Sequence, residues 1–395
     1  MLTGMVLIDL QKVCDTIDHE IFFSKIVYLG FSQATISWYK SYLTNRTFLV
    51  NVEKNLSSPG DLTCGVPQGS ILGPLIFLLY VNDMSNSVDC DLLLYADDSC
   101  LIFTGPDLKS IETNLNKNFN SLCDWFVENK LSIHFGEDKT KSIVFGSQKR
   151  LKNIDKLDIR RGDIKIKQHT SVTYLGCELD QYLSGESMVT KVLGKINGRL
   201  KFLFRKKSFL NGSLRRMLCN SLIQPHFDYA CSAWYPNLNK KYMKKVQIAQ
   251  NKCIRFCLFL ENRAHIGVKE FRKINWIPTR ERFEQCISVG VYKFCKNISP
   301  AYMSDIFVKN SIRHNTRRST EMLTIPMKNT NVGQQGLSYL GPKFWNILPS
   351  KIKLSTSANS FKHALKEDYF EQLQKVEDDP FLYPLHYRGK YSISL

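Results

Sequence analysis

Continuous apolar runs in the first part of the chain predict short buried strands. Residues 5–8 form one such run, which ends at Asp9, so we expect a buried strand with a carboxylate at its C-terminal end. Residues 92–95 and 100–103 are two further β-prone runs, separated by Ala96-Asp97-Asp98-Ser99. This spacing predicts a hairpin with carboxylates at its tip.

Apolar positions at helical spacing fill the intervals between these strands. Residues 19–44 are predicted to be helical, with apolar side chains at Ile26, Leu29, Ile36, Tyr39 and Leu43. A Gly/Pro cluster at residues 65–70 opens a second, apolar helix that runs to about Met84. A third helix ends near Asn129, and its apolar face is formed by Ile111, Leu115, Leu122 and Phe126.

The pattern changes in the second half of the chain. Residues 133–145 and 164–174 favour strands, with Arg161-Gly162 as a turn, and beyond Ser187 the sequence becomes mostly helical and basic. We therefore predict an α+β protein with three parts, residues 1–184, 185–260 and 261–395. A length of 395 residues accommodates two or three domains of ordinary size.

Charge is divided unevenly between the two halves. Residues 1–150 hold 12 basic and 17 acidic residues, and subtraction from the totals of 54 and 36 leaves 42 basic and 19 acidic residues in 151–395. The net charges are therefore −5 and +23. Such a basic half suits a polyanion, because cations facing phosphates release condensed counterions. A charge that only maintains solubility is the alternative.

Cysteine spacing and hydropathy exclude other classes. The twelve cysteines include no CxxC pair; Cys253 and Cys257 lie one helical turn apart without a second Cys/His pair at zinc-finger spacing. We expect buried thiols in a reducing compartment. The longest apolar run, residues 75–81, is much shorter than the roughly 20 residues of a membrane span. The start lacks a basic leader and a cleavage site, so an intracellular protein without a membrane partner is expected.

The carboxylates of Asp9, Asp97 and Asp98 point to metal chemistry. An Asp at a strand end and an Asp pair at a hairpin tip converge if their strands are neighbours in one sheet. Three close carboxylates raise one another's pKa, and the arrangement becomes favourable when Mg²⁺ lies among them. Two such ions, about 3.5–4 Å apart, serve phosphoryl transfer. The alternative is that Asp-Asp is only good turn chemistry.

The neighbouring residues favour the metal site. Tyr95-Ala96-Asp97-Asp98 resembles the YADD box of reverse transcriptases. Residues 65–74, GVPQGSILGP, resemble the GVPQGS-x-LGP segment of non-LTR (LINE-type) retrotransposon enzymes, and residues 8–19 resemble their LDLxKAFDTVDH box. Three boxes in the family's order, with Asp97 following Asp9 by 88 positions, make the resemblance specific.

Further segments extend the resemblance over nearly the whole chain. Trp125, residues 129–132 and Lys139-Thr140 resemble the region after the YADD hairpin, and residues 174–177 are similar to the primer-grip segment. Segments similar to the thumb and C-terminal region of the same elements are residues 225–229, 250–252, 276–278, 315–317 and 341–349.

This resemblance implies a fold and an activity. The fold would be a right-hand polymerase palm, an antiparallel sheet with packed helices, followed by a helical thumb and a mostly helical, basic C-terminal region. The activity would be RNA-directed DNA synthesis with two Mg²⁺ ions, or Mn²⁺, adding dNTPs to a DNA primer on an RNA template. Family analogy places such a protein in the nucleus and cytoplasm, and the oligomeric state stays open.

Site residues follow position by position from the resemblance. Asp9 and Asp97 would be the principal metal ligands, with Asp98 completing the triad and the Leu10 carbonyl nearby. The nucleotide would meet Cys14, Gln68, Gly69 and Lys139. The primer terminus would be held by Tyr174, Leu175, Gly176 and Cys177. Nucleic acid would contact Arg46, Lys191, Lys195, Arg199 and Arg205.

Several of these residues keep an ordinary alternative. Gln68 and Arg46 could be plain surface residues, Lys139 a solvated lysine, and residues 174–177 the end of a core strand. Asp15 and Asp18 are left out of the metal site, because both fall where the chain enters a helix and the helix dipole favours acids there.

Two departures from the family bear on activity. Val13-Cys14 replaces the family's Ala-Phe, and the smaller Cys14 predicts weaker rejection of ribonucleotides or a slower enzyme. Asp9 lies eight residues from the start, so the preceding fingers strands are not in this sequence, and an exposed sheet edge or apolar patch is expected. The alternative function is an inactive retroelement remnant that binds nucleic acid through residues 185–395. A telomerase-like enzyme or a maturase is disfavoured.

Overall fold

The computed structural model describes residues 1–152, 154–310 and 322–375, which form two compact units. The first unit comprises Met1–Gly176 with Asp180–Tyr182, and the second comprises Cys177–Leu179 with the chain from Leu183 onward. Antiparallel sheets and helices occur together in the first unit, and helices make up most of the second. An α+β class is therefore confirmed.

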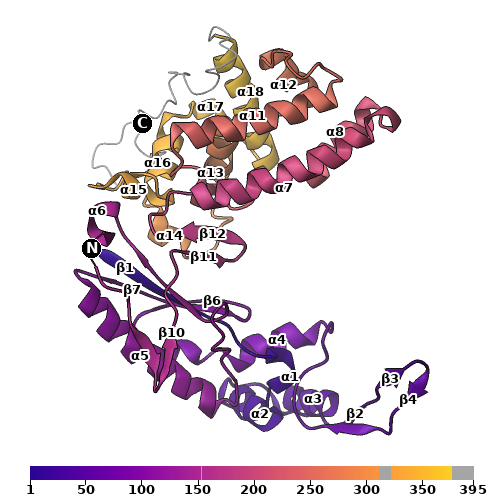
Figure 1. The fold of residues 1–395 in the computed structure, drawn as a ribbon, viewed down its shortest axis with the longest axis vertical. Helices are drawn as coiled ribbons and strands as arrows, with labels where there is room; N and C mark the ends of the chain where they lie inside the picture. The colour runs from indigo at the N-terminus through magenta and orange to yellow at the C-terminus, as the bar shows by residue number, and fades with distance from the viewer. Residues whose placement is uncertain (153, 311–321, 376–395) are drawn as a thin grey trace. The chain divides into compact units, whose positions relative to one another are not determined.

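A four-stranded antiparallel sheet, as far as the described residues show, is the centre of the first unit (Figure 1). Its strand order is β6-β7-β1-β8, so the first strand of the chain lies between two strands that follow it much later. The register pairs Met5 with Ile102 on one side and with Ile143 on the other. The bounds are β1 Leu2–Ile8, β6 Asp91–Tyr95, β7 Asp98–Gly105 and β8 Lys141–Phe145.

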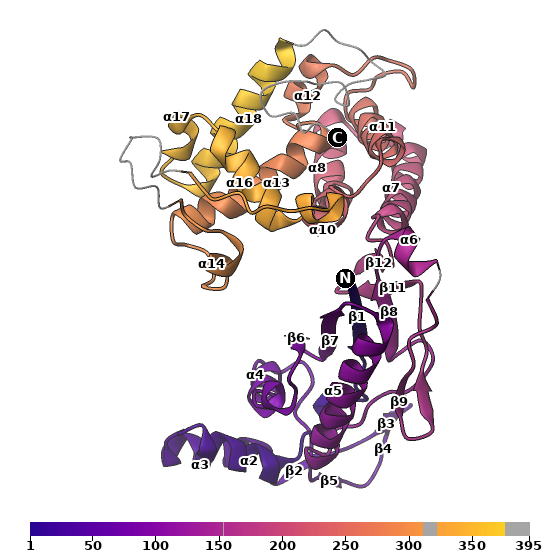
Figure 2. The same cartoon turned by 90° about the vertical axis from the view of Figure 1, so that its left-hand side faces the viewer.

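Helix α5, Leu108–Glu128, covers one face of this sheet (Figure 2). Its predicted apolar face is confirmed, because Ile111, Leu115, Leu122 and Phe126 are all buried. Gly4 of β1 allows the close approach: a Cβ at this position would lie 2.4 Å from Ile111 Cγ2. The predicted end of the helix at Asn129 is also the observed C-cap.

The predicted helix over residues 19–44 is two helices. They are α2, His19–Tyr28, and α3, Gln33–Leu43, and between them Gly30 adopts a φ of 79° that ends the first helix. The apolar helix after the Gly/Pro cluster is shorter than predicted. It forms α4, Leu72–Tyr80, and then the 3₁₀ helix η1, Met84–Ser87. The remaining short helices of the first unit are α1, Val13–Thr16, and α6, Gln148–Leu151.

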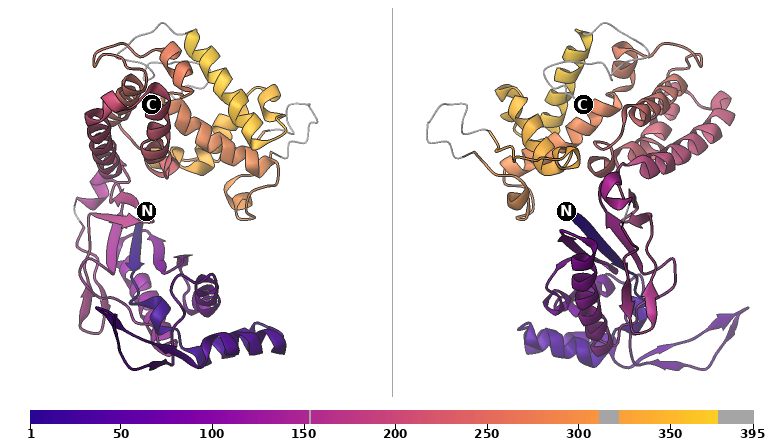
Figure 3. Two further views of the ribbon diagram at one scale, coloured as in Figure 1. Left: turned by 90° about the vertical axis from the view of Figure 1, so that its right-hand side faces the viewer. Right: turned by 60° about the vertical axis from the view of Figure 1, so that its left-hand side comes forward.

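Short two-stranded ribbons complete the first unit. Two of them, β2 with β5 and β3 with β4, form successive parts of one extended arm that projects from helices α2 and α3 (Figure 3). The predicted strand over residues 133–145 was too long: only β8 forms, and Ile133 makes a single bridge to Leu10. The ribbons comprise β2 Arg46–Phe48, β3 Asn51–Val52, β4 Asn55–Leu56, β5 Gly60–Leu62, β9 Ile159–Arg161, β10 Ile164–Ile166, β11 Ser171–Tyr174 and β12 Cys177–Asp180. Most of β12, Cys177–Leu179, belongs to the second unit.

The edge strand β6 agrees with the expected exposed apolar edge. One side of β6 pairs with β7, and its Leu93 and Leu94 side chains are 46% and 39% exposed.

Helices make up most of the second unit. Helix α13 lies at its centre and packs against α16 and α18. The helices, in chain order, are α7 Glu186–Arg205, η2 Lys207–Phe209, α8 Gly212–Leu222, α9 Gln224–Asp228, α10 Cys231–Trp234, α11 Lys240–Cys257, α12 Val268–Ile274, α13 Thr279–Cys295, α14 Met303–Ile306, α15 Asn331–Gln334, α16 Leu337–Ile347, α17 Ser350–Lys353 and α18 Ala358–Gln374.

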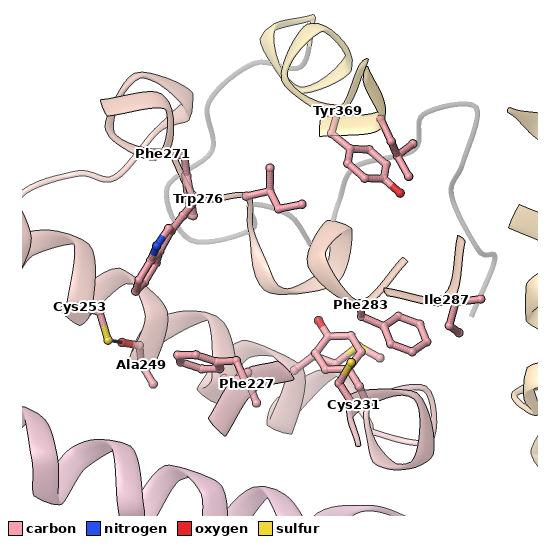
Figure 4. Packing of buried hydrophobic residues seen from close by; sticks show 14 of the residues in the cluster. Phe227, Cys231, Ala249, Cys253, Phe271, Trp276, Phe283, Ile287 and Tyr369 are labelled. Atoms are coloured by element: carbon pink, nitrogen blue, oxygen red, sulfur yellow. Dashed lines mark hydrogen bonds between the residues drawn. The ribbon is translucent and has the colours of Figure 1, made fainter. Parts of the chain in front are cut away.

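One hydrophobic cluster joins residues on both sides of position 260. Phe227 and Cys253 belong to it together with Phe283 and Tyr369 (Figure 4). The division into 1–184, 185–260 and 261–395 stays a prediction.

All twelve cysteines are free thiols; Cys253 and Cys257 are buried as expected, whereas Cys64 is exposed. Among the described residues, no helix combines the length and apolar character that crossing a membrane requires.

Candidate active site

Strand register brings the three predicted carboxylates to one end of the sheet. Ile8, the last residue of β1, pairs with Ser99 of β7, so Asp9 and Asp98 follow at the adjoining positions of the two strands. Tyr95 pairs with Asp98, which leaves Ala96-Asp97 as a two-residue hairpin turn in which Ala96 adopts a φ of 53°. Asp98 is thus the first residue of β7 rather than part of the turn, which the sequence had placed at residues 96–99.

The Asp98 carboxyl has a raised pKa. Burial is the largest cause, and the negative charges of Asp97 and Asp9 add to it. Each charge makes ionisation of the next carboxyl harder, and a bound cation would reverse that effect. Asp97 and Asp98 are exposed, so their side chains are accessible to solutes.

Asp9 is held by a segment that precedes β8. Its amide donates to Thr140 Oγ1 over 3.3 Å, and its carbonyl accepts from the His134 amide over 2.8 Å. Lys139 Nζ lies 3.3 Å from Asp9 Oδ2. Both side chains of this ion pair are more than a third exposed, so the pair adds little to stability. Lys139, predicted to contact the nucleotide, therefore does lie beside a predicted metal ligand.

The donor set fits a hard divalent cation. Three carboxyl groups supply the oxygen ligands that Mg²⁺ prefers. A bound cation would relieve the repulsion among their negative charges. As the side chains stand, the described part of the chain holds no group of three or more His, Cys, Asp or Glu residues close enough to coordinate an ion. The Leu10 backbone lies next to Asp9 and bridges to Ile133.

The glycine-rich segment is attached to the chain that follows β1. The Gly65 amide donates to the Ile17 carbonyl over 2.8 Å, and the Val66 amide donates to the Cys14 carbonyl over 2.7 Å. Gly65 adopts a φ of 81°, and a Cβ there would lie 2.9 Å from the Asp15 carbonyl oxygen. Glycine is therefore required at position 65 by both backbone conformation and space.

Three of the predicted nucleotide-binding residues lie on these two segments. Burial raises the pKa of the Cys14 thiol, and the negative charges of Asp15 and Asp97 add to this shift. Gln68 Nε2 donates to Asp15 Oδ1 over 2.9 Å. Gly69 adopts a φ of 80°, and the space beside it is open.

Sequence reasoning missed the part that Asp15 plays. We had set it aside with Asp18 as an acid at a helix start. Asp18 does cap α2, accepting from the Ile21 amide over 3.0 Å. Asp15 lies in the first turn of α1, as expected, and also orients Gln68, 53 residues away. No spacing in the sequence signals that contact.

The predicted primer-grip residues form a tight hairpin. Tyr174 ends β11, Cys177 starts β12, and Leu175 and Gly176 between them have φ values of 45° and 74°. Positive φ at both turn residues is typical of a two-residue hairpin, yet a leucine there is strained. Tyr174 and Cys100 of β7 share a side-chain hydrogen bond, and burial raises their pKa values to about 12 and about 11. The hairpin is thereby tied to the strand that begins at Asp98.

The predicted nucleic-acid contacts are arranged in two places. Arg46 begins β2 and pairs with Leu62 in the arm. Lys191, Lys195 and Arg199 recur at intervals of four and form one stripe on α7. Lys191 Nζ is paired with Glu178 over 3.0 Å, and Arg199 donates to the Leu222 carbonyl. Lys195 is exposed, as is Arg205 at the end of the helix.

Comparison with known proteins identifies the class. A match to the family described as reverse transcriptase (RNA-dependent DNA polymerase) spans residues 2–179, a range that includes the sheet, its carboxylates and the hairpin of β11 and β12. Residues 2–179 are therefore similar to the reverse transcriptase family. Relatives named as RNA-directed DNA polymerases of transposons support a LINE-type, non-LTR reverse transcriptase.

Two such relatives come from Drosophila melanogaster. The chain is 25% identical over 227 residues to the probable RNA-directed DNA polymerase from transposon X-element, covering 55% of this chain and 24% of the relative. It is 26% identical over 263 residues to the probable RNA-directed DNA polymerase from transposon BS, covering 63% and 28%. The chain thus spans about a quarter of the length of these relatives. Among solved structures, telomerase from Candida tropicalis in complex with the TWJ fragment of telomeric RNA is similar at a TM-score of 0.34 and 13% identity, over 74% of this chain and 47% of that one.

Proposed function

We propose that this chain catalyses RNA-directed DNA synthesis, adding dNTPs to the 3′-hydroxyl of a primer. The observation that carries the proposal is the register of β1, β7 and β6, which supports a joint role for Asp9, Asp97 and Asp98 at one sheet end. The names of the relatives, RNA-directed DNA polymerases of transposons, support the same reaction.

Asp9, Asp97 and Asp98 would hold two divalent cations, with Mg²⁺ as the expected metal and Mn²⁺ as a substitute. Rotation of the exposed Asp97 and Asp98 side chains would bring their oxygens toward Asp9. When bound, the metal ions supply charge stabilisation for the attacking and leaving oxygens of an in-line displacement.

The surrounding side chains would position the nucleotide. The Lys139 ammonium group is now paired with Asp9. It would pair instead with the triphosphate of the nucleotide and would donate a proton to the leaving pyrophosphate. Gln68, oriented by Asp15, would lie against the nucleotide and template. The open space beside Gly69 supports a close approach of the ligand to the backbone there.

Template and primer would meet two further surfaces. The hairpin of Tyr174, Leu175, Gly176 and Cys177 would hold the primer terminus, and its tie to Cys100 would keep it in register with the carboxylates. Arg46 and the stripe of α7 would contact phosphates. Because residues 151–395 carry a net charge of +23, binding of RNA and DNA should weaken steeply with salt.

A second function is favoured by one observation. Within the described ranges no three ligand side chains stand within coordinating distance, which is compatible with a chain that binds nucleic acid without catalysis. Extension of oligo(dT) on poly(rA) separates the two functions. Mg²⁺-dependent incorporation of dTTP that EDTA abolishes supports the polymerase. Salt-sensitive binding of the template–primer with no incorporation in Mg²⁺ or Mn²⁺ supports the inactive remnant.

A further inference from the structure

A polar cavity of about 570 Å³ opens in the second unit, and none of the residues that the proposed polymerase uses lines it. It is bordered by α8, α9, the link from α12 to α13, the first turn of α13, and α18. The polar side chains that define its chemistry are Arg216, Asn220, Gln224, Asp228, Arg282 and Lys366.

Sequence segments that the proposed active site leaves unexplained meet at this cavity. Residues 225–229 supply Asp228, and residues 276–278 supply Trp276. A third such segment, residues 250–252, fixes the wall from behind, because the fully buried Gln250 donates from Nε2 to the Ile277 carbonyl over 2.9 Å. Three separated segments thus build one feature.

Hydrogen bonds make the walls rigid. Arg282 donates to both carboxylate oxygens of Asp228, over 2.8 and 2.7 Å, in the bidentate geometry that fixes a guanidinium plane. Trp276 Nε1 donates to Asn220 Oδ1 over 2.7 Å, and the Trp276 ring is buried in the hydrophobic cluster (Figure 4). Lys366 donates to the Asn275 backbone and side-chain carbonyls.

The cavity holds more positive than negative charge. Arg216, Arg282 and Lys366 line it, and among its described lining residues Asp228, already bound by Arg282, is the one acid. Arg216 is exposed and forms no ion pair with any residue in the described part of the chain. Burial lowers the pKa of Lys366 to about 8, and the positive charge of Arg282 contributes to the same shift. With this pKa Lys366 is still mostly protonated at pH 7, and an anion bound beside it would favour the charged form further.

We propose that this cavity binds a phosphodiester group of a nucleic-acid strand, with Arg216 and Lys366 as the direct contacts and Arg282 as the fixed charge behind them. The inference rests on the proposed function only in taking nucleic acid as the anion. A guanidinium and an ammonium that converge on one polar cavity match the charge and the several acceptor oxygens of a phosphate. Sequence-independent binding follows, because the backbone is what these groups recognise.

Binding of a fluorescently labelled single strand of about 20 nucleotides to the full chain, followed by anisotropy between 50 and 200 mM KCl, tests the proposal. The cavity variant is Arg216→Gln with Lys366→Gln. Its matched control is Lys241→Gln with Lys244→Gln, which removes the same charge from exposed positions on α11 that do not line the cavity. We expect the cavity variant to bind at least ~10-fold more weakly, with a salt slope smaller by about 1.4, because each phosphate contact contributes about 0.7 on a single strand. The control should lose less than ~2-fold.

Equal losses in the two variants, or no loss in the cavity variant, would overturn the proposal. Because Lys366 also holds Asn275, Arg216→Gln alone provides a second test that leaves every wall hydrogen bond in place. It should weaken binding by roughly 3-fold or more, and Arg216→Lys, which keeps the charge, should recover most of the affinity. RNA and DNA of one sequence should respond alike; an effect confined to one of them contradicts recognition of the phosphodiester.

This assay is independent of catalysis. A chain that extends no primer but shows the cavity effect would refute the proposed polymerase and retain the phosphate site. A chain that extends primers while its cavity variant binds normally would support the proposed polymerase and refute the phosphate site.

Discussion

Two groups of acidic side chains, one in each unit, lie in opposite environments. Asp9, Asp97 and Asp98 stand at strand ends of the first unit, where solvent reaches them. Glu281 and Glu284 lie on one face of α13 in the second unit, and each is only 3% exposed. Burial raises the pKa of Glu281 to about 7 and that of Glu284 to about 8, although the positive charge of Arg280 opposes both shifts.

The difference shows what a carboxylate needs to act as a ligand. The first unit places its acids where backbone pairing ends, so repulsion among them persists and a cation can relieve it. In the second unit burial favours the neutral acid, although Glu284 also accepts from Arg280 Nε over 3.2 Å. Clusters of acids in a sequence do not distinguish the two cases, because exposure is decided by the fold.

The largest expected effect concerns the buried pair. A carboxyl whose pKa is raised on folding contributes stability that is present below its unfolded value of 4.5 and is lost as the pH rises through about 7. Glu281→Gln should therefore stabilise the protein at pH 8 by about 3 kcal/mol and change little at pH 4.5. Urea unfolding at the two pH values measures this. Glu371→Gln, at an exposed position of α18, is the control, and a pH-independent effect of Glu281→Gln would contradict burial as the cause.

A smaller effect, here a loss of stability, is expected when the hydrogen bonds behind the polar cavity are broken. Gln250→Leu keeps the volume but leaves the Ile277 carbonyl without its donor, which should cost about 2 kcal/mol of unfolding free energy. The urea midpoint measures it. Gln33→Leu, at an exposed position of α3, should change the free energy by less than ~0.5 kcal/mol. Equal midpoints for the wild type and Gln250→Leu would show that this hydrogen bond does not hold the wall.

A substitution at Cys14, a thiol whose pKa is raised in part by the charge of Asp97, tests the carboxylate end of the sheet. Restoring the family's aromatic residue with Cys14→Phe should raise the preference for dNTP over rNTP by about 10-fold, a change of ~1.4 kcal/mol, because a larger side chain excludes the 2′-hydroxyl. Single-nucleotide extension with dTTP and UTP measures the ratio. A strong dNTP preference already present in the natural protein would contradict the predicted role of Cys14.

The smallest effect is expected at the hairpin turn. Leu175 has a φ of 45°, and asparagine tolerates this conformation better, so Leu175→Asn should stabilise the protein by about 1 kcal/mol. Thermal unfolding measures the gain. If extension falls while stability rises, the leucine side chain is retained for the primer; if stability falls instead, the turn is not strained by leucine.

Elements with a strong period were predictable from sequence, and those fixed by distant contacts were not. The apolar face of α5 followed from periodicity, and the strand before Asp9 followed from its continuous apolar run. Pairing of that strand with β7 was a condition of the predicted site that the sequence did not itself establish. The break at Gly30 was missed because apolar spacing continues across it. The strand over residues 133–145 was overextended because a single bridge at Ile133 has the same local pattern as a strand.

The site divides in the same way. Asp9, Asp97 and Asp98 could be named because each stands next to a recognisable strand. The contact of Asp15 with Gln68 and the ion pair of Lys139 with Asp9 could not, since both depend on how loops fold back. The cavity in the second unit was invisible for the same reason: its lining residues lie on segments far apart in the chain.

The measurement that tests the central claim most directly is Mg²⁺-dependent extension of oligo(dT) on poly(rA) by the wild type, by Asp97→Ala and by Asp91→Ala. Asp91 is an exposed acid at the start of β6, distant along the strand from the turn, and serves as the charge control. We predict that Asp97→Ala lowers the rate at least ~10²-fold, while template–primer binding is retained and Asp91→Ala is close to the wild type. Equal rates for Asp97→Ala and the wild type would contradict the carboxylate site.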